Sequence, residues 1–146
     1  MKISTKGRYG LRILLDLALH ESVSPRMIRD IAESQNISEK YISRLIIELR
    51  KAGMVKSIRG AKGGYKLART PKYLTLLDVV EVMEGPVAIV DCVESPRCCT
   101  RQDLCAARDI WTRLNTEIRD SLAKVTLQDI VDQSRRNTAD FMDYCI

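Results

Sequence analysis

The chain has 146 residues, of which 45% are hydrophobic and 29% charged, and its formal net charge is +5 at pH 7. This length suits one domain of ordinary size or a small domain with an appended helix, and it argues against a multidomain enzyme. The sequence has no signal peptide and no apolar run of the roughly 18 residues that cross a bilayer, so we expect a cytoplasmic protein with no membrane partner.

The positive charge is concentrated in the first half of the chain. Residues 1–70 contain 15 Lys and Arg against 6 Asp and Glu, a net charge of +9, whereas residues 71–146 contain 9 against 13, a net charge of −4. A basic module joined to a mildly acidic one is typical of a polyanion-binding protein, although a solubilising surface would give the same totals. The arrangement of the basic residues decides between these interpretations.

Three predicted helices begin the chain. Apolar residues recur at helical spacing over residues 5–20, and a shorter amphipathic helix is predicted over residues 27–35. Ser38 is in the N-cap position of a third helix that ends at about Ala52. Two helices joined by a tight turn, the second with polar and basic outward residues, form the helix-turn-helix arrangement that reads the DNA major groove. The residues of the third helix that we expect to contact DNA are Ser38, Lys40, Tyr41, Ser43 and Arg44.

A glycine-rich hairpin is predicted after these helices. Residues 54–69 form two short alternating segments around a turn that contains three glycines. A basic hairpin beside a helix-turn-helix is typical of the wing of a winged helix; glycine lets its backbone approach DNA closely, and arginine suits a narrow minor groove. We therefore expect Arg59, Lys62 and Gly63 to contact DNA, and residues 1–70 to form a winged helix-turn-helix domain.

The second half of the chain is predicted to be mostly helical. A connecting helix falls within residues 71–91 and a cysteine-rich loop within residues 92–106. Residues 107–134 then contain a long amphipathic helix and a short final helix, which leaves residues 135–146 as a loosely ordered tail. Once the winged domain is complete, the long helix has little of its own chain to pack on, so we expect it to be a dimerisation helix. The predicted fold class is mainly α with a small β-hairpin.

The cysteines are the second clue to function. Four of the five lie within fourteen residues, at Cys92, Cys98, Cys99 and Cys105. An odd number of cysteines in a reducing compartment argues against a disulfide framework and favours a metal site, such as tetrahedral zinc, or a thiol switch. A small thiol or electron-transfer enzyme is disfavoured, because the sequence has no Cys-x-x-Cys motif, nucleotide-binding loop or acid–base pair.

Three segments carry a resemblance to a known family: Met-Lys-Ile-Ser-Thr-Lys-Gly-Arg-Tyr-Gly at residues 1–10, Val-Lys-Ser-Ile-Arg-Gly-Ala-Lys-Gly-Gly-Tyr at residues 55–65, and the cysteine loop followed by Trp111. The chain resembles the Rrf2 family of winged-helix transcriptional regulators over residues 1–134, and within it the regulators of iron–sulfur cluster biogenesis. The resemblance implies a homodimeric repressor that binds operator DNA of cluster-assembly genes. It also implies a 2Fe-2S cluster in the loop before the long helix, supplied by the cluster-assembly machinery.

The family pattern assigns the cluster ligands only in part. It implies three cysteines and a histidine three positions after the last of them. Cys99 and Cys105 keep the family spacing and Cys92 is the first ligand, with Cys98 as an alternative to Cys99 or as a fourth ligand. Arg108 is at the histidine position, and a guanidinium has no lone pair to offer a metal. The fourth ligand stays open among Cys98, a carboxylate and a residue of the partner subunit.

Position 43 bears on how DNA binding responds to the presence or loss of the cluster. In the iron–sulfur regulators an acidic residue at this position of the recognition helix is linked to the DNA specificity of the apo form. Ser43 carries no carboxylate, so we expect cluster loss to change DNA affinity without changing sequence preference. A redox- or nitric-oxide-responsive repressor of the same family and a zinc-binding winged-helix regulator are the alternative hypotheses.

Overall fold

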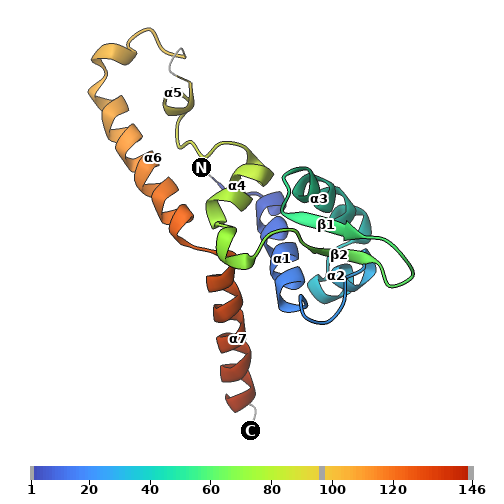
Figure 1. Ribbon diagram of the computed structural model, residues 1–146. Coiled ribbons are helices and arrows are strands. Elements are labelled where there is room, and N and C mark those ends of the chain that lie inside the picture. The colour runs from blue at the N-terminus through green and yellow to red at the C-terminus, as the bar shows by residue number, and fades with distance from the viewer. Residues whose placement is uncertain (1, 96–97, 145–146) are drawn as a thin grey trace.

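The computed structural model describes residues 2–95 and 98–144, and it is mainly helical with one small hairpin (Figure 1). The first half consists of α1 (Thr5–Leu19), α2 (Ile28–Gln35), α3 (Glu39–Lys51), β1 (Val55–Ile58) and β2 (Gly64–Leu67). The second half consists of a 3₁₀ turn (Pro71–Tyr73), α4 (Leu76–Glu84), α5 (Asp91–Glu94), a second 3₁₀ turn (Gln102–Leu104), α6 (Ala106–Lys124) and α7 (Leu127–Tyr144). The predicted fold class is confirmed.

The hydrophobic core lies where α1, α2, α3 and α4 meet. Apolar positions at helical spacing face it from α1 and α3, and the fully buried side chains among them are Ile13, Leu14, Leu17, Ile42, Leu45, Ile46 and Leu49. Burial of each such side chain stabilises the folded chain by about 1.5–3 kcal/mol. The core therefore fixes α3 against α1 and leaves the opposite face of α3 toward solvent.

The C-terminal end of α4 holds the N-terminus of α1. Glu84 Oε1 accepts hydrogen bonds from the Ser4 amide at 3.1 Å, the Ser4 hydroxyl at 2.7 Å and the Gly7 amide at 2.8 Å. A Cβ atom on Gly7 would lie only 2.5 Å from the same carboxylate oxygen. Because the first amides of a helix have no partner within the helix and are electropositive, this carboxylate both caps α1 and joins it to α4.

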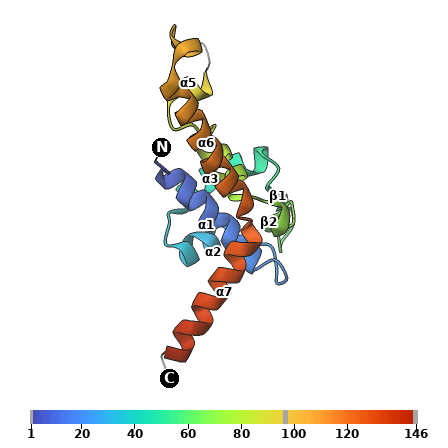
Figure 2. The same cartoon turned by 90° about the vertical axis from the view of Figure 1, so that its left-hand side faces the viewer.

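The helices α6 and α7 form a long arm along one side of the winged domain. Figures 1 and 2 show the loop end of α6 extending past the domain in one direction and α7 in the other. The junction of the two helices is anchored to the start of α4, since the Leu76 amide donates to the Val125 carbonyl and the Leu127 amide to the Leu74 carbonyl, each at 2.8 Å. None of the helices in the described part of the chain is long and apolar enough to cross a membrane.

The end of the chain differs from the prediction. We expected the last helix to end at about Ser134 and residues 135–146 to form a loose tail, but α7 continues to Tyr144. This prediction was wrong because the helix continues beyond the residues that pack on the core. No Gly or Pro interrupts residues 127–144, and polar pairs one turn apart, such as Gln133 Nε2 to Asn137 Oδ1 at 2.7 Å, support the exposed part. Residues 145–146 of the expected tail lie outside the described residues.

Candidate nucleic-acid interface and cysteine loop

Local capping sets the turn between α2 and α3. Asn36 ends α2 in the left-handed conformation, with φ 53° and ψ 50°, which asparagine tolerates better than most residues. Two residues later the Ser38 hydroxyl accepts a hydrogen bond from the Tyr41 amide at 3.3 Å, so the predicted N-cap of α3 is confirmed. The tight turn places α3 across α2 with its polar face outward.

The outer face of α3 carries the residues predicted to contact DNA. Lys40 and Arg44 are exposed there. The Ser43 hydroxyl donates to the Glu39 carbonyl of its own helix at 2.8 Å. Tyr41 is half-buried, and its ring and that of Tyr9 form a T-shaped pair with the ring centroids 5.9 Å apart. Lys40 and Arg44 are thus exposed cationic groups of this face, as is Lys51 two turns further along, whereas Ser43 and Tyr41 are already engaged within the protein.

The hairpin β1–β2 forms an exposed tip over a buried base. Val55 pairs with Leu67 at the base, where both side chains are buried. At the tip Arg59 and Lys62 are exposed. A Cβ atom on Gly63 would collide with the carbonyl oxygen of Ile58, so the turn itself requires glycine at this position. The structure therefore gives Gly63 a conformational role in presenting the two cations.

Arg26 attaches this hairpin to the helices. Its amide donates to the Tyr65 carbonyl at 3.0 Å and its carbonyl accepts from the Tyr65 amide at 2.8 Å, so it pairs with β2 as a third strand would. The two backbone segments approach so closely that a Cβ atom on Gly64 would lie 2.6 Å from the Arg26 carbonyl oxygen. The base of the hairpin is thereby fixed to the segment that leads into α2.

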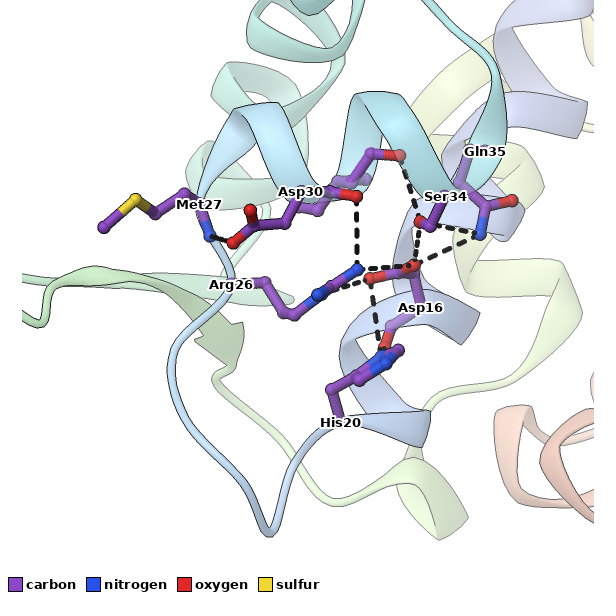
Figure 3. Close-up of polar contacts among 8 residues, drawn as sticks. Asp16, His20, Arg26, Met27, Asp30, Ser34 and Gln35 are labelled. Atoms are coloured by element: carbon purple, nitrogen blue, oxygen red, sulfur yellow. Dashed lines mark hydrogen bonds and ion pairs between the residues drawn. The ribbon is translucent and has the colours of Figure 1, made fainter.

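The side chain of Arg26 ends in a buried polar network centred on Asp16 (Figure 3). The Asp16 carboxylate is 1% exposed and accepts from Arg26 Nε at 2.9 Å, from Gln35 Nε2 at 3.2 Å and from the Ser34 hydroxyl. Burial opposes ionisation of Asp16, but the hydrogen bonds from Arg26, Ser34 and Gln35 outweigh it and lower the pKa of this carboxyl. His20 Nδ1 lies 2.8 Å from the Asp16 carbonyl oxygen. The network joins α1, α2 and the hairpin.

Sequence reasoning missed this network. The available signal was a single aspartate within the apolar stripe of α1, next to Leu17, where a buried carboxylate requires partners. Those partners are supplied by α2 and the segment before it, and helical periodicity does not identify them.

The cysteine loop joins α4 to α6. Cys92 lies in α5 and Cys105 directly precedes α6, both half-buried, and Cys98 and Cys99 are exposed between them. Cys105 also lines an open pocket of about 630 Å³ formed by residues 100–101 and 103–106. Within the described ranges, no three His, Cys, Asp or Glu residues lie close enough together to hold a metal ion. The three cysteines that the resemblance groups as ligands therefore do not form a metal-binding group in the described part of the chain.

Arg108, at the position where the resemblance implies a histidine ligand, has a different partner. Its Nε atom donates to the carbonyl oxygen of Cys92 at 3.2 Å. The guanidinium therefore holds the backbone of α5 against α6.

The chain matches a known protein family over most of its length. The Rrf2 family model, described as an iron-dependent transcriptional regulator, matches residues 3–133. The chain belongs to the Rrf2 family. Among Rrf2 relatives, the regulator CymR of Bacillus subtilis is 39% identical over 99% of each chain, and protein rrf2 of Nitratidesulfovibrio vulgaris is 44% identical over 90% of this chain and 87% of its own. IscR of Pectobacterium atrosepticum is 34% identical over 98% of this chain and 87% of its own.

Solved Rrf2 structures have the same fold. The structure of CymR, described as the global cysteine regulator of B. subtilis, gives a TM-score of 0.77 over 91% of this chain and 98% of that chain, at 39% identity. T. potens IscR gives 0.74 over 92% and 88%, at 36% identity. The chain is a DNA-binding transcriptional regulator and not an enzyme, as expected. The expectation that it is specifically an iron–sulfur regulator is not supported at the same level, because CymR is the more similar of the two.

Proposed function

We propose that this Rrf2 protein is a homodimeric repressor of iron–sulfur cluster biogenesis genes with the cysteine loop as its sensor. The observation that carries the proposal is the placement of Cys92, Cys98, Cys99 and Cys105 in one loop directly before α6. The likeness to IscR at 34–36% identity and the iron-dependent character of the family support it.

The DNA-binding part of the proposal rests on the charged surface of the winged domain. We place α3 in the major groove of operator DNA, with Lys40 and Arg44 as its cationic contacts, and the hairpin tip with Arg59 and Lys62 in the adjacent minor groove. Ser38, Tyr41, Ser43 and Gly63 complete the predicted interface by setting the shape of the helix start and of the turn.

Exposed apolar side chains on and directly after α6 support the homodimer in this proposal. Ile110 and Trp111 of α6 are 47% and 42% exposed, and Val125, which directly follows the helix, is 36% exposed. A second copy of α6 would cover such side chains and place two winged domains on successive half-sites. This arrangement would let one cysteine loop influence the spacing of both domains.

The donor set suits a 2Fe-2S cluster because thiolates are the usual protein ligands of iron in such clusters. Cys92, Cys99 and Cys105 would hold it, with Cys98 as the fourth thiolate in place of the missing histidine. When bound, a cluster of this kind supplies sensitivity to iron supply and to oxidants. The loop has to rearrange for these thiols to meet at one cluster, since no three potential ligands among the described residues lie close enough together to hold a metal ion.

The test is anaerobic reconstitution with iron, sulfide and the cluster-assembly machinery. We expect a brown protein with charge-transfer absorption and with bound iron and acid-labile sulfide. The Cys92→Ala, Cys99→Ala, Cys105→Ala variant should show neither the absorption nor the bound iron and sulfide. A colourless protein that binds only zinc would contradict the proposal. A wild-type protein that gains no cluster but responds to an oxidant or to nitric oxide would support a bare thiol switch instead.

A second candidate is a regulator of cysteine genes. The observation that favours it is the 39% identity to CymR over 99% of each chain. On this alternative the triple cysteine variant binds operator DNA as the wild type does under every redox condition. The operators recovered from the cell would then lie before genes of sulfur metabolism.

A further inference from the structure

Asn115 is a buried polar residue on a helix whose other residues are half-buried or exposed. This residue is 6% exposed, and it is the one buried position among the described residues of α6. A buried amide is destabilising unless its donor and acceptor both have partners. Both are satisfied by the chain that leads to the cysteine loop: Oδ1 accepts from the Ile89 amide at 3.0 Å and Nδ2 donates to the Val87 carbonyl at 3.2 Å.

These two bonds make the side chain of Asn115 act as a neighbouring strand would. Residues 87 and 89 lie on either side of Ala88 in a segment without regular structure. The side-chain amide of Asn115 thus bonds both the backbone carbonyl of Val87 and the backbone amide of Ile89. The segment is therefore positioned by α6, three residues before Cys92.

Two arginines on the same face of α6 extend this contact. Arg108 precedes Asn115 by seven residues, or two helical turns, and donates to the Cys92 carbonyl at 3.2 Å. Arg119 follows Asn115 by four residues and pairs with Glu81 of α4. A single polar stripe of α6 thus contacts the end of α4, the segment after it and the start of the cysteine loop.

The same end of α4 continues the path to the DNA-reading helices. Glu84 bonds the N-terminus of α1 through Ser4 and Gly7. The core then fixes α1 against α3. Asn115 and Arg108 therefore bond the segment through which a movement of the loop would act on α6 and on α4.

We propose that Asn115 and Arg108 form a clamp that couples the position of the cysteine loop to the DNA-binding state of the winged domain. This inference rests on the proposed function, since it supplies the route by which the loop acts on DNA binding. Both are positioning residues, because they hold backbone groups of residues 87–92 and provide no ligand.

The first test measures amide hydrogen exchange in the metal-free full-length protein. Asn115→Leu removes both bonds, and we expect exchange in residues 86–93 to rise about tenfold, the factor that corresponds to the loss of about 1.4 kcal/mol of hydrogen bonding. Peptides from α3 and β1–β2 keep their exchange rates. Thr116→Val is the matched control, since that hydroxyl bonds only the Thr112 carbonyl of its own helix among the described residues. Unchanged exchange in residues 86–93 of Asn115→Leu overturns the clamp.

The second test measures coupling, which a merely structural role would not produce. Because coupling between two sites is reciprocal, binding of DNA has to alter the loop. We expect a duplex selected by the wild-type protein from a random pool to slow exchange in residues 86–93. The effect should be lost in Asn115→Leu and in Arg108→Gln, and kept in Arg113→Gln, whose arginine is exposed beside Glu117.

The two variants keep the inference testable if one of them does not fold. A wild-type loop that does not respond to DNA, or a response that persists in Arg108→Gln, overturns the coupling. Both experiments use metal-free protein. Failure of the wild type to take up a cluster therefore refutes the proposed sensor and leaves the exchange data to decide on the clamp.

Discussion

Arg26 joins the wing to the core through Asp16. Its Nε atom lies 2.9 Å from Oδ1 of a carboxylate that is 1% exposed, while its backbone pairs with Tyr65 of β2. The same residue therefore contributes a strand-like contact to the hairpin and an ion pair to α1. The orientation of the wing relative to α1 depends on both.

Loss of the Asp16 carboxylate should destabilise the protein strongly. Asp16→Ala leaves the Arg26 guanidinium, 18% exposed, without its counter-ion, and removing one partner of a buried ion pair costs about 3 kcal/mol or more. Urea denaturation measures the change, with Asp140→Asn on the exposed end of α7 as a control that leaves stability unaltered. A loss below about 1 kcal/mol would show that Arg26 finds another partner.

The lowered pKa of Asp16 makes stability depend on pH in the acid range. The unfolded carboxyl has a pKa of about 3.9, and the folded pKa lies below it, so the unfolded state binds more protons in the window between them. The contribution is fully present above about pH 4 and is lost as pH falls through the folded pKa. Asp16→Asn should show a shallower dependence of unfolding free energy on pH below about pH 4. An unchanged slope would contradict the assignment.

Asp129 provides a second acid-range contribution. The hydroxyl and amide of Thr126 donate to this exposed carboxylate and lower its pKa. Because Asp129 shares none of these partners with Asp16, the effects of Asp129→Asn and Asp16→Asn on the pH slope should add. The unfolding free energy of each single variant, measured against pH, gives the contribution of one carboxyl. The double variant tests whether the two contributions add.

The winged domain could be predicted because its determinants are local. Helical spacing identified the buried faces of α1 and α3, Ser38 identified the start of α3, and the glycines identified the hairpin turn. Each of these signals depends on residues within a few positions of one another.

The polar anchors could not be predicted, because their partners are distant in the sequence. Asp16 bonds Arg26 and Gln35, and Asn115 bonds residues 87 and 89. A polar residue in an amphipathic helix gives the same pattern whether it faces water or a buried backbone. The extent of α7 was missed for a related reason, since the exposed turns after Ser134 bury no apolar stripe that would mark a helix.

The effects of substitutions at Glu84 and Gly7 on stability should not be additive, because both residues take part in the contact between α4 and the start of α1. Glu84→Ala removes the acceptor of two amides and one hydroxyl and is expected to cost about 1–2 kcal/mol. Gly7→Ala places a methyl group against the same carboxylate, so it should have a similar effect. In the double variant the losses should overlap by at least about 0.5 kcal/mol, as a double-mutant cycle in urea would measure. Full additivity would show that the methyl group is accommodated elsewhere.

Arg59 should contribute to DNA affinity through the wing. It is exposed at the hairpin tip, where the turn geometry at Gly63 presents it to solvent. Arg59→Ala is expected to weaken binding by about 1–3 kcal/mol if the guanidinium enters the minor groove. Fluorescence anisotropy at fixed moderate salt measures this, with Arg136→Ala on α7 as the matched control. Equal affinities for Arg59→Ala and the wild type would remove the wing from the mechanism.

Ser43 bears on whether the sensor changes affinity or sequence preference. Its hydroxyl donates to the Glu39 carbonyl at 2.8 Å, so this position of α3 presents no charge to DNA. If the proposed cluster forms, its loss should change affinity by a similar factor at every operator, because no carboxylate is present to repel one sequence more than another. The measurement is anaerobic binding by the cluster-loaded protein and by the Cys92→Ala, Cys99→Ala, Cys105→Ala variant across a panel of operators at one salt concentration. Ser43→Glu serves as the comparison, since the added carboxylate repels the phosphates of every duplex but accepts a hydrogen bond only from a base that presents a donor, so it should make the operators unequal. An inverted order of preferred operators between the loaded protein and the triple variant would show that Ser43 does not determine this behaviour.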